Sequence, residues 1–268
     1  MKGSRRVMFC AVLALATVGM AMDTVAQTDE EFVHIFPFLG QWDPQIGSPD
    51  GQDRGNCGGH LGDWGEKLLN CTMPVGRLPL NSRGEAWLRY VDQLQSPTQG
   101  DCAQISFPAV LGDVIYISAY PGRLVMEHPS NPWHVTRTVW MSGTGPEPIP
   151  GQLFQHGLSR GHFDGDDLVI ETDHFTFDPD GMDDHLHMAS SVRKKITERY
   201  RLIDDDNLRL IITLEDPTFL TEPFTYAFVF TKAGLGGPRQ GWRNCDAESA
   251  RREQEFAYPG DKYPDARQ

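Results

Sequence analysis

Histidines beside acidic residues supply most of the candidate chemistry in this 268-residue chain. Six of the nine histidines fall within residues 134–187, and the densest stretch runs from Asp173-His174 to His185-Leu186-His187 through several aspartates. Histidine next to a carboxylate suits proton transfer near neutral pH, because its ordinary pKa is about 6.5. We therefore predict His174, His185, His187 and Asp173 as catalytic residues, in a loop at the mouth of a rigid scaffold.

The pair His185 and His187 also has a metal-ligand spacing, since residues two apart on an extended chain point the same way. Glu171 or Asp173 would complete such a site, but no histidine follows His187 to act as a third ligand. A metal site is therefore an alternative, and a solvated acidic loop is another. The sequence has no dinucleotide fingerprint, phosphate loop or haem-attachment motif, so we expect no cofactor.

Glu198-Arg199-Tyr200 alternates along a predicted strand, which places Glu198 and Tyr200 on one face and Arg199 on the other. Ile196 and Leu202 share the Glu198 face, so we expect that face to be buried. A buried carboxylate needs a cationic partner. The candidates are three arginines: Arg137, Arg160 and Arg209. Glu198 and Tyr200 join the predicted catalytic set, although an ion pair that only fixes strand register remains open.

A second polar group surrounds Gly157-Leu158-Ser159-Arg160-Gly161. These letters fit the G-x-S-x-G elbow of serine hydrolases, but they lie in a strand pattern that feeds a hairpin and not in a strand-to-helix turn. We therefore do not expect a serine nucleophile. The predicted ligand-binding residues are His156, Ser159, His162, Trp140 and Arg199.

The elements that must position these residues are strands. From residue 113 onward, β-branched and aromatic runs alternate with turn signals. The predicted strands cover residues 114–117, 124–127, 134–141, 158–163, 168–175, 195–203, 208–215 and 224–231. Parallel strands need crossovers of about a dozen residues, usually helical, so we expect an antiparallel sheet. Eight strands that hide their edges predict an all-β, lipocalin-like barrel wide enough for one small ligand.

The N-terminus has the pattern of a cleavable export signal: basic Lys2, Arg5 and Arg6, an apolar run over Val7–Val18, and small residues ending at Ala26. The run is too short for a bilayer, which needs about 20 apolar residues, so we expect no stable membrane insertion. The mature protein is then periplasmic or secreted. The chain divides into a signal at 1–26, an irregular lead-in at 27–112 with a helix at 82–94, a barrel at 113–245 and a tail at 246–268.

The net charge and the cysteines indicate which partners and cross-links to expect. A net charge of −13 repels phosphate backbones, so we expect no nucleic-acid partner. Four cysteines remain after the signal: Cys57, Cys71, Cys102 and Cys245. An even number in an exported chain predicts two disulfides, and of three pairings we favour Cys57–Cys71 with Cys102–Cys245. Zinc is the rival interpretation, but no CxxC knuckle is present.

Three motifs resemble those of a large family of exported, lipocalin-like bacterial proteins. Residues 157–172 are similar to the family's G-x-S-x-G-x-W-[ED]-G-D-T-L-V-[VI]-[DE]-T, with Phe163 in place of Trp. Residues 190–200 resemble S-S-x(4)-[VI]-x-E-R-[YF], and residues 215–223 resemble E-D-P-x-x-[LF]-T-x-P. Leu158 stands where many members carry His, so no catalytic role transfers to that position. The resemblance implies export and a β-barrel, and it brings no agreed reaction.

These observations predict an exported small-molecule enzyme. Its substrate would be largely apolar and lie in the barrel, where acid–base groups act as an isomerase, cyclase, lyase or dehydratase without a cofactor. A non-catalytic small-molecule binding protein and a metal-dependent enzyme using His185 and His187 are the alternatives. The oligomeric state is left open.

Overall fold

The computed structural model describes residues 33–45, 60–61, 67–68, 78–91, 104, 106–129, 134–183 and 187–233. Several predictions fall outside these residues: the signal at 1–26, the tail at 246–268, His185, and the cysteines Cys57, Cys71, Cys102 and Cys245. Export and the disulfides therefore stay predictions. No helix within the described ranges is long and apolar enough to span a membrane.

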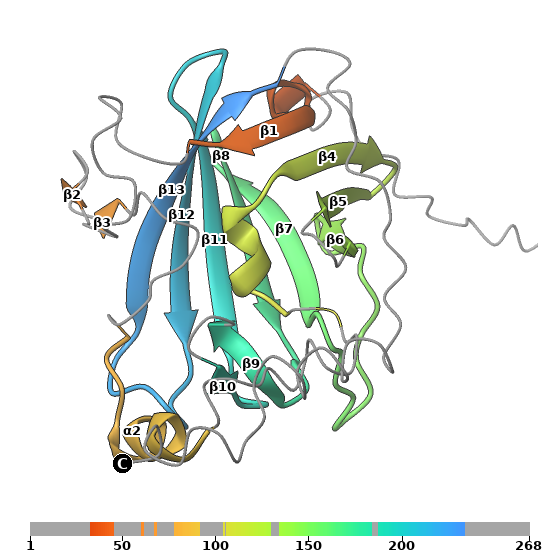
Figure 1. Cartoon of the computed structure of the whole chain (residues 1–268). Helices are drawn as coiled ribbons and strands as arrows, with labels where there is room; N and C mark the ends of the chain where they lie inside the picture. The colour runs from red at the N-terminus through yellow and green to blue at the C-terminus, as the bar shows by residue number, and fades with distance from the viewer. Residues whose placement is uncertain are drawn as a thin grey trace, which may run out of the picture.

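Nine strands close into a barrel, which confirms the predicted all-β class (Figure 1). In barrel order they are β1 (Gly40–Pro44), β4 (Ile115–Tyr120), β5 (Arg123–Pro129), β6 (His134–Met141), β7 (Leu158–Asp164), β8 (Asp167–Asp173), β11 (Lys195–Leu202), β12 (Asn207–Glu215) and β13 (Phe224–Lys232). Strand β1 pairs with both β4 and β13 and so closes the ring, with Trp42 opposite both Ile115 and Lys232.

The predicted count of eight strands is wrong by one. All eight sequence-predicted strands are present, and the ninth is β1, which lies in the lead-in that we expected to be irregular. The strand is five residues long and includes Gly40 and Pro44, so it has too little alternation to be recognised from sequence. Its central Trp42 is fully buried and anchors the closure.

The sheet is also not wholly antiparallel. Strands β6 and β7 pair in parallel, with Val139 opposite Ser159 and Met141 opposite Gly161. Residues 142–157 form the crossover that returns the chain to the same end of the barrel, and they do so without a helix. At Gly161 a Cβ would lie 2.6 Å from the Met141 sulfur, so the side chain of the neighbouring strand fills the space that glycine leaves.

The barrel interior is lined by every second residue of each strand. On β12 and β13 the inward positions are Leu208, Leu210, Ile212, Leu214, Phe224, Tyr226, Phe228 and Phe230, all buried. Two short 3-10 helices, η1 (Phe36–Phe38) and η2 (Ala109–Gly112), add side chains to the same core. Phe107, just before η2, is fully buried among them.

The remaining elements lie outside the ring. Short β2 (His60–Leu61) and β3 (Lys67–Leu68) flank β13, and β9 (Asp178–Asp183) pairs with β10 (Met188–Ser190). Figure 1 shows this hairpin and the helix α2 (Ser82–Tyr90) at the same end of the barrel.

Helix α2 begins at the predicted residue, Ser82, and ends earlier than predicted. The N-cap is Asn81, because the Asn81 side chain accepts hydrogen bonds from the backbone N–H groups of Arg83 and Gly84. The Asn81 amide also donates to the carbonyls of Thr218 and Leu220, which fixes the helix to the turn before β13. The helix ends at Tyr90, earlier than the predicted residue 94.

Candidate functional site

A buried ion pair lies inside the barrel and joins strands that are far apart in sequence. Arg137 of β6 donates from both Nη atoms to the Glu198 carboxylate of β11, each at 2.6 Å. The Tyr200 hydroxyl donates to Glu198 at 2.7 Å. Glu198 and Tyr200 have no exposed surface. The prediction that Glu198 is buried and paired with an arginine is confirmed, and Arg137 is the partner.

Burial and the neighbouring charges fix the protonation states of Arg137 and Tyr200. Burial opposes the charge of Arg137, but Glu198 outweighs burial and raises the pKa of the guanidinium. Burial and the Glu198 charge raise the pKa of Tyr200 well above its ordinary value, so the phenol stays protonated. Both carboxylate oxygens accept hydrogen bonds, and the pair adds no net charge to the interior.

Phe107 links the ion pair to two histidines. The Arg137 guanidinium lies 4.3 Å from the centre of the Phe107 ring. The rings of His128 and His156 meet the same Phe107 ring edge-on, with centres 5.3 and 5.8 Å away. His128 ends the inward row of β5, and His156 precedes β7. Three groups able to bond a ligand therefore surround one apolar ring.

His128 is the unusual member of this set. Its side chain has 0% exposure, and neither ring nitrogen has a hydrogen-bond partner among the described residues. A buried polar group without a partner costs about 1–3 kcal/mol. Burial, and after it the charge of Arg137, lowers the pKa of His128 well below the ordinary value, so the imidazole is neutral. One of its nitrogens is then a free donor and the other a free acceptor.

His156 has one paired and one unpaired nitrogen. Its Nε2 lies 2.9 Å from the side-chain oxygen of Gln104, whose amide nitrogen donates to the His134 carbonyl. That oxygen can only accept, so Nε2 carries the proton and Nδ1 keeps a free lone pair. Nδ1 is buried and unpaired among the described residues. Burial, together with the charges of Lys194 and Arg137, lowers the pKa of His156 to about 4.

A buried lysine holds the Phe107 segment in place. Lys194 Nζ donates to the carbonyls of Phe107 at 2.5 Å and Gly181 at 3.0 Å, and to the Ser106 hydroxyl at 3.3 Å. Burial lowers the pKa of Lys194 to about 7, against the attraction of two nearby aspartates, Asp178 and Asp216. With three acceptors around it, Lys194 serves as a tether between the segment and β9.

The other predicted catalytic residues lie apart from this interior group. His174 Nδ1 is 2.6 Å from Asp173 at the end of β8, and both side chains are about one-third exposed. His187 Nδ1 is 3.1 Å from Asp180 in the buried β9–β10 hairpin. The described residues contain no group of three or more histidines, cysteines or acids placed to hold a metal.

The predicted ligand-binding residues divide between the interior and the outside. His156 belongs to the group around Phe107, and the buried Ser159 hydroxyl is hydrogen-bonded to Thr172. The Arg123 guanidinium lies over the Trp140 ring, 5.9 Å from the ring centre. His162 is exposed. Arg199 pairs with Asp164 and Asp167 at the β7–β8 turn, away from the interior.

The sequence did not identify four residues of this interior group: Phe107, His128, Arg137 and Lys194. Arg137 was predicted only as a possible ion-pair partner of Glu198. Alternation would have found His128, since Leu124 and Met126 of the same strand point inward four and two residues earlier. The predicted strand ended one residue too soon, at Glu127. Nothing in the sequence marks Phe107, because its role comes from contacts with β5 and β6.

Comparisons with known proteins do not identify a family for this chain. No protein-family model matches the chain, and no curated protein matches it. Among solved structures, the chain is similar to the crystal structure of a mutant of the fluorescent protein UnaG, with 12% sequence identity and a TM-score of 0.31. The match covers 75% of this chain and 99% of that one. Similarity this weak says nothing about ligand or reaction.

Proposed function

We propose that the protein is an exported, cofactor-independent enzyme that binds a small, neutral, largely apolar molecule in the barrel and transfers a proton within it. The observation behind this proposal is the fully buried His128 with two unpaired ring nitrogens, next to the unpaired Nδ1 of His156, among the residues that the structure describes. Unpaired buried polar atoms destabilise a fold and are rare in native proteins, and a functional role is one explanation for them.

The charges around Phe107 favour a neutral substrate. Arg137 and Glu198 cancel each other, and burial keeps His128 and His156 uncharged at neutral pH. The Lys194 ammonium is already bonded to the Phe107 and Gly181 carbonyls. A ligand carboxylate would have to compete with Glu198 for Arg137, which is already bonded twice. Apolar neighbours such as Leu124, Val139 and Ile170 line the same interior.

The unpaired atoms supply both halves of a proton transfer. The Nδ1 lone pair of His156 takes a proton from a carbon beside a carbonyl group, and the electron pair moves to the carbonyl oxygen. The N–H of His128 and the unpaired Nε–H of Arg137 donate to that oxygen. Where the ketone carries a β,γ double bond, His156 then gives the proton to the γ-carbon. The electron pair returns from the oxygen, the carbonyl re-forms and the double bond moves into conjugation, which gives an isomer. Bases of similar strength perform this step in apolar sites.

Phe107 occupies the volume that a substrate would use. Its ring contacts Arg137, His128 and His156, which are the groups that would hold the reacting atoms. Substrate binding would therefore displace the Phe107 ring. Replacing Phe107 with Ala should open this volume and strengthen binding of N-phenylnaphthylamine, a neutral apolar probe whose fluorescence rises on binding.

The reaction is tested with the purified protein, small neutral ketones and their β,γ-unsaturated relatives in D2O. Deuterium uptake is followed by mass spectrometry and conjugation by ultraviolet absorbance. His128→Phe and His156→Phe should each lower the rate by about 10²–10⁴-fold. His162→Phe changes an exposed histidine on β7 and is the matched control, with an unchanged rate.

Two outcomes would contradict the proposal in different ways. An unchanged rate in His128→Phe and His156→Phe would remove these histidines from the chemistry. Probe binding in wild type and Phe107→Ala, without deuterium uptake from any ketone, would favour the alternative of a binding protein. His174→Ala and His187→Ala, tested in parallel, measure the two histidine–aspartate pairs outside the Phe107 group.

A further inference from the structure

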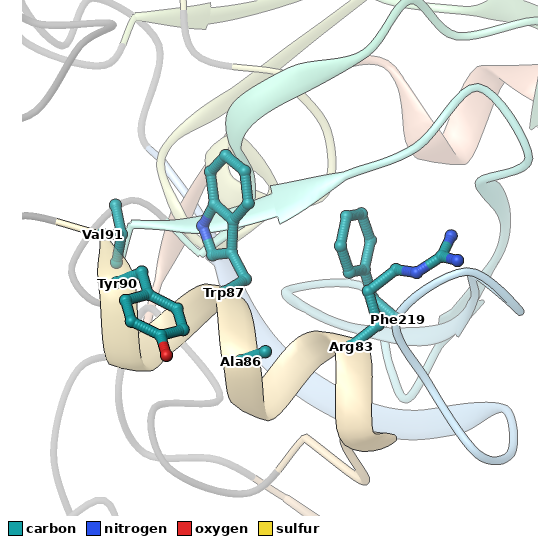
Figure 2. Close-up of a pocket in the computed structure, with 6 residues that line it drawn as sticks. All are labelled: Arg83, Ala86, Trp87, Tyr90, Val91 and Phe219. Atoms are coloured by element: carbon teal, nitrogen blue, oxygen red, sulfur yellow. The ribbon is translucent and has the colours of Figure 1, made fainter.

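A separate apolar pocket of about 480 Å³ lies along α2, outside the barrel interior. It is lined by Arg83, Ala86, Trp87, Tyr90, Val91 and Phe219. Figure 2 shows Tyr90 and Val91 toward one end of the helix and Arg83 toward the other, with the Trp87 indole between them. Pockets of 300–1,000 Å³ hold small ligands.

The pocket floor is fixed in position. The Trp87 indole N–H donates to the His187 carbonyl at 2.7 Å, and the indole meets the rings of Phe177 and Phe219 edge-on. A Cβ on Gly84 would lie 2.6 Å from the Phe219 carbonyl, so the helix approaches this turn as closely as glycine permits. These contacts preorganise the aromatic surface, which lowers the entropy lost on binding.

A ligand in this pocket would bury exposed aromatic rings nearby. Tyr90 is 82% exposed and Phe177 is 51% exposed. Large aromatic side chains left in water beside a pocket are typical of binding sites. Burying them against an apolar chain contributes roughly 25 cal/mol per Å² of apolar surface.

The charge of the pocket selects the ligand's polar end. Arg83 is the only charged residue in its lining, and no carboxylate in the described part of the chain pairs with its guanidinium. Arginine binds carboxylates through two parallel hydrogen bonds. The pocket therefore combines an aromatic floor with a cation at one end.

We propose that this pocket binds an amphipathic carboxylate, with its alkyl chain on Trp87, Tyr90 and Phe219 and its carboxylate at Arg83. This site is independent of the proposed reaction in the barrel. It extends the ligand range of the protein to anions, which the neutral interior disfavours.

The test is calorimetric titration of the purified full chain with decanoate and decylamine below their micelle concentrations and with decanol below its solubility limit. We expect decanoate to bind most tightly and decylamine least. Ala86→Trp fills the pocket and should weaken decanoate binding more than tenfold. Arg83→Gln should weaken decanoate by up to about fivefold, as expected for an exposed ion pair, and leave decanol unchanged.

Three controls locate the site. Arg89→Gln removes a cation from the same helix outside the pocket and should leave all affinities unchanged. Tyr90→Ala changes a side chain that contributes little to the core, and it should weaken decanoate and decanol alike even if Ala86→Trp does not fold. His128→Phe should leave decanoate binding intact, which separates this site from the barrel interior.

Decanoate affinity that is equal in wild type, Ala86→Trp and Tyr90→Ala would overturn the site. Tighter binding of decylamine than of decanoate, or equal loss of decanol and decanoate affinity in Arg83→Gln, would overturn the role of Arg83. No binding of decanoate to the wild-type protein at millimolar concentration would overturn the proposal as a whole.

Discussion

The two faces of β11 carry similar charged residues in opposite situations. On the inner face, Glu198 has no exposed surface and is bonded to Arg137 and Tyr200. On the outer face, Arg199 is one-third exposed and bridges Asp164 and Asp167 at 2.7 Å each. Adjacent residues of one strand thus place an ion pair in an apolar interior and another in contact with water.

The difference lies in what surrounds each pair. Arg201 also bonds Asp167, so both arginines of the outer network are paired, and their partly exposed charges are screened by solvent. In the inner pair both carboxylate oxygens of Glu198 are bonded, but Arg137 Nε is not. The pair also stands beside His128 and His156, whose ring nitrogens are not all paired within the described part of the chain. The outer network is explained by stability, whereas the inner group contains atoms that stability does not explain.

Breaking the inner ion pair should have the largest effect on the free energy of unfolding. Glu198→Gln removes the negative charge and leaves Arg137 buried without its counter-ion. Loss of one partner of a buried pair costs about 3–5 kcal/mol, and we expect a decrease in the free energy of unfolding of that size. Urea denaturation at pH 7, monitored by tryptophan fluorescence, measures it.

The double variant Arg137→Met/Glu198→Leu is the control for this prediction. It removes both charges together, so it should recover most of the stability lost in Glu198→Gln. A loss below about 1 kcal/mol in Glu198→Gln would mean that water or a rearranged side chain compensates Arg137, and the inner pair would then resemble the outer one.

The neutral histidines should make stability fall in mild acid. The folded protein keeps His156 neutral down to a pKa of about 4, while the unfolded chain takes up this proton near pH 6.5. Between these values the unfolded state binds more protons, so stability decreases as the pH falls from about 6.5 to 4. A shift of this size corresponds to about 3 kcal/mol, and His128 acts in the same direction.

Urea midpoints measured from pH 7 to pH 4 check this sign. Carboxylates also titrate in the lower part of the range, so the comparison is between wild type and His156→Gln. The variant should lose less stability than wild type over the same interval. Parallel curves for the two proteins would show that His156 takes up its proton at the same pH in the folded and unfolded states, so that burial does not lower its pKa.

Alternation along strands was the part of the structure that sequence could predict. It placed Glu198 inward and Arg199 outward, because Ile196 and Leu202 share the Glu198 face, and the structure agrees. It located eight of the nine barrel strands for the same reason. Strand β1 was not predicted, because a five-residue strand that includes Gly40 and Pro44 has almost no alternation of apolar and polar residues.

The candidate site could be predicted only in part, because contacts between distant segments define it. Glu198 and Tyr200 are two residues apart, so alternation joins them. Arg137 and Glu198 are 61 residues apart, and only the closed barrel makes them neighbours. Phe107 precedes a 3-10 helix and has no periodic pattern around it. His174 and His187, which sequence favoured, instead form separate pairs with Asp173 and Asp180 outside this group.

Replacing His128 should raise stability, which is the opposite of the usual core substitution. His128→Phe removes two unpaired nitrogens and keeps an aromatic ring of similar size beside Phe107. We expect a gain of about 1–2 kcal/mol in the free energy of unfolding, since the desolvation cost of the imidazole disappears. A gain together with the loss of proton transfer would identify His128 as a group kept for function. Destabilisation by more than about 1 kcal/mol would show instead that the imidazole is bonded in the folded protein, through water or another side chain.

The smallest effect belongs to the outer network. Arg199→Gln should lower the free energy of unfolding by no more than about 1 kcal/mol, because the guanidinium is partly exposed and Arg201 still bonds Asp167. Burial alone would raise the pKa of Asp167, but hydrogen bonds from Arg201 and Arg199 outweigh it and lower the pKa. The contribution of Asp167 is therefore complete above its ordinary pKa of about 3.9, and it is lost as the pH falls further. The effect of Arg199→Gln should shrink below about pH 4 and in roughly 1 M NaCl, whereas that of Glu198→Gln should persist in salt. Equal salt sensitivity of the two variants would remove the distinction between the two faces of β11.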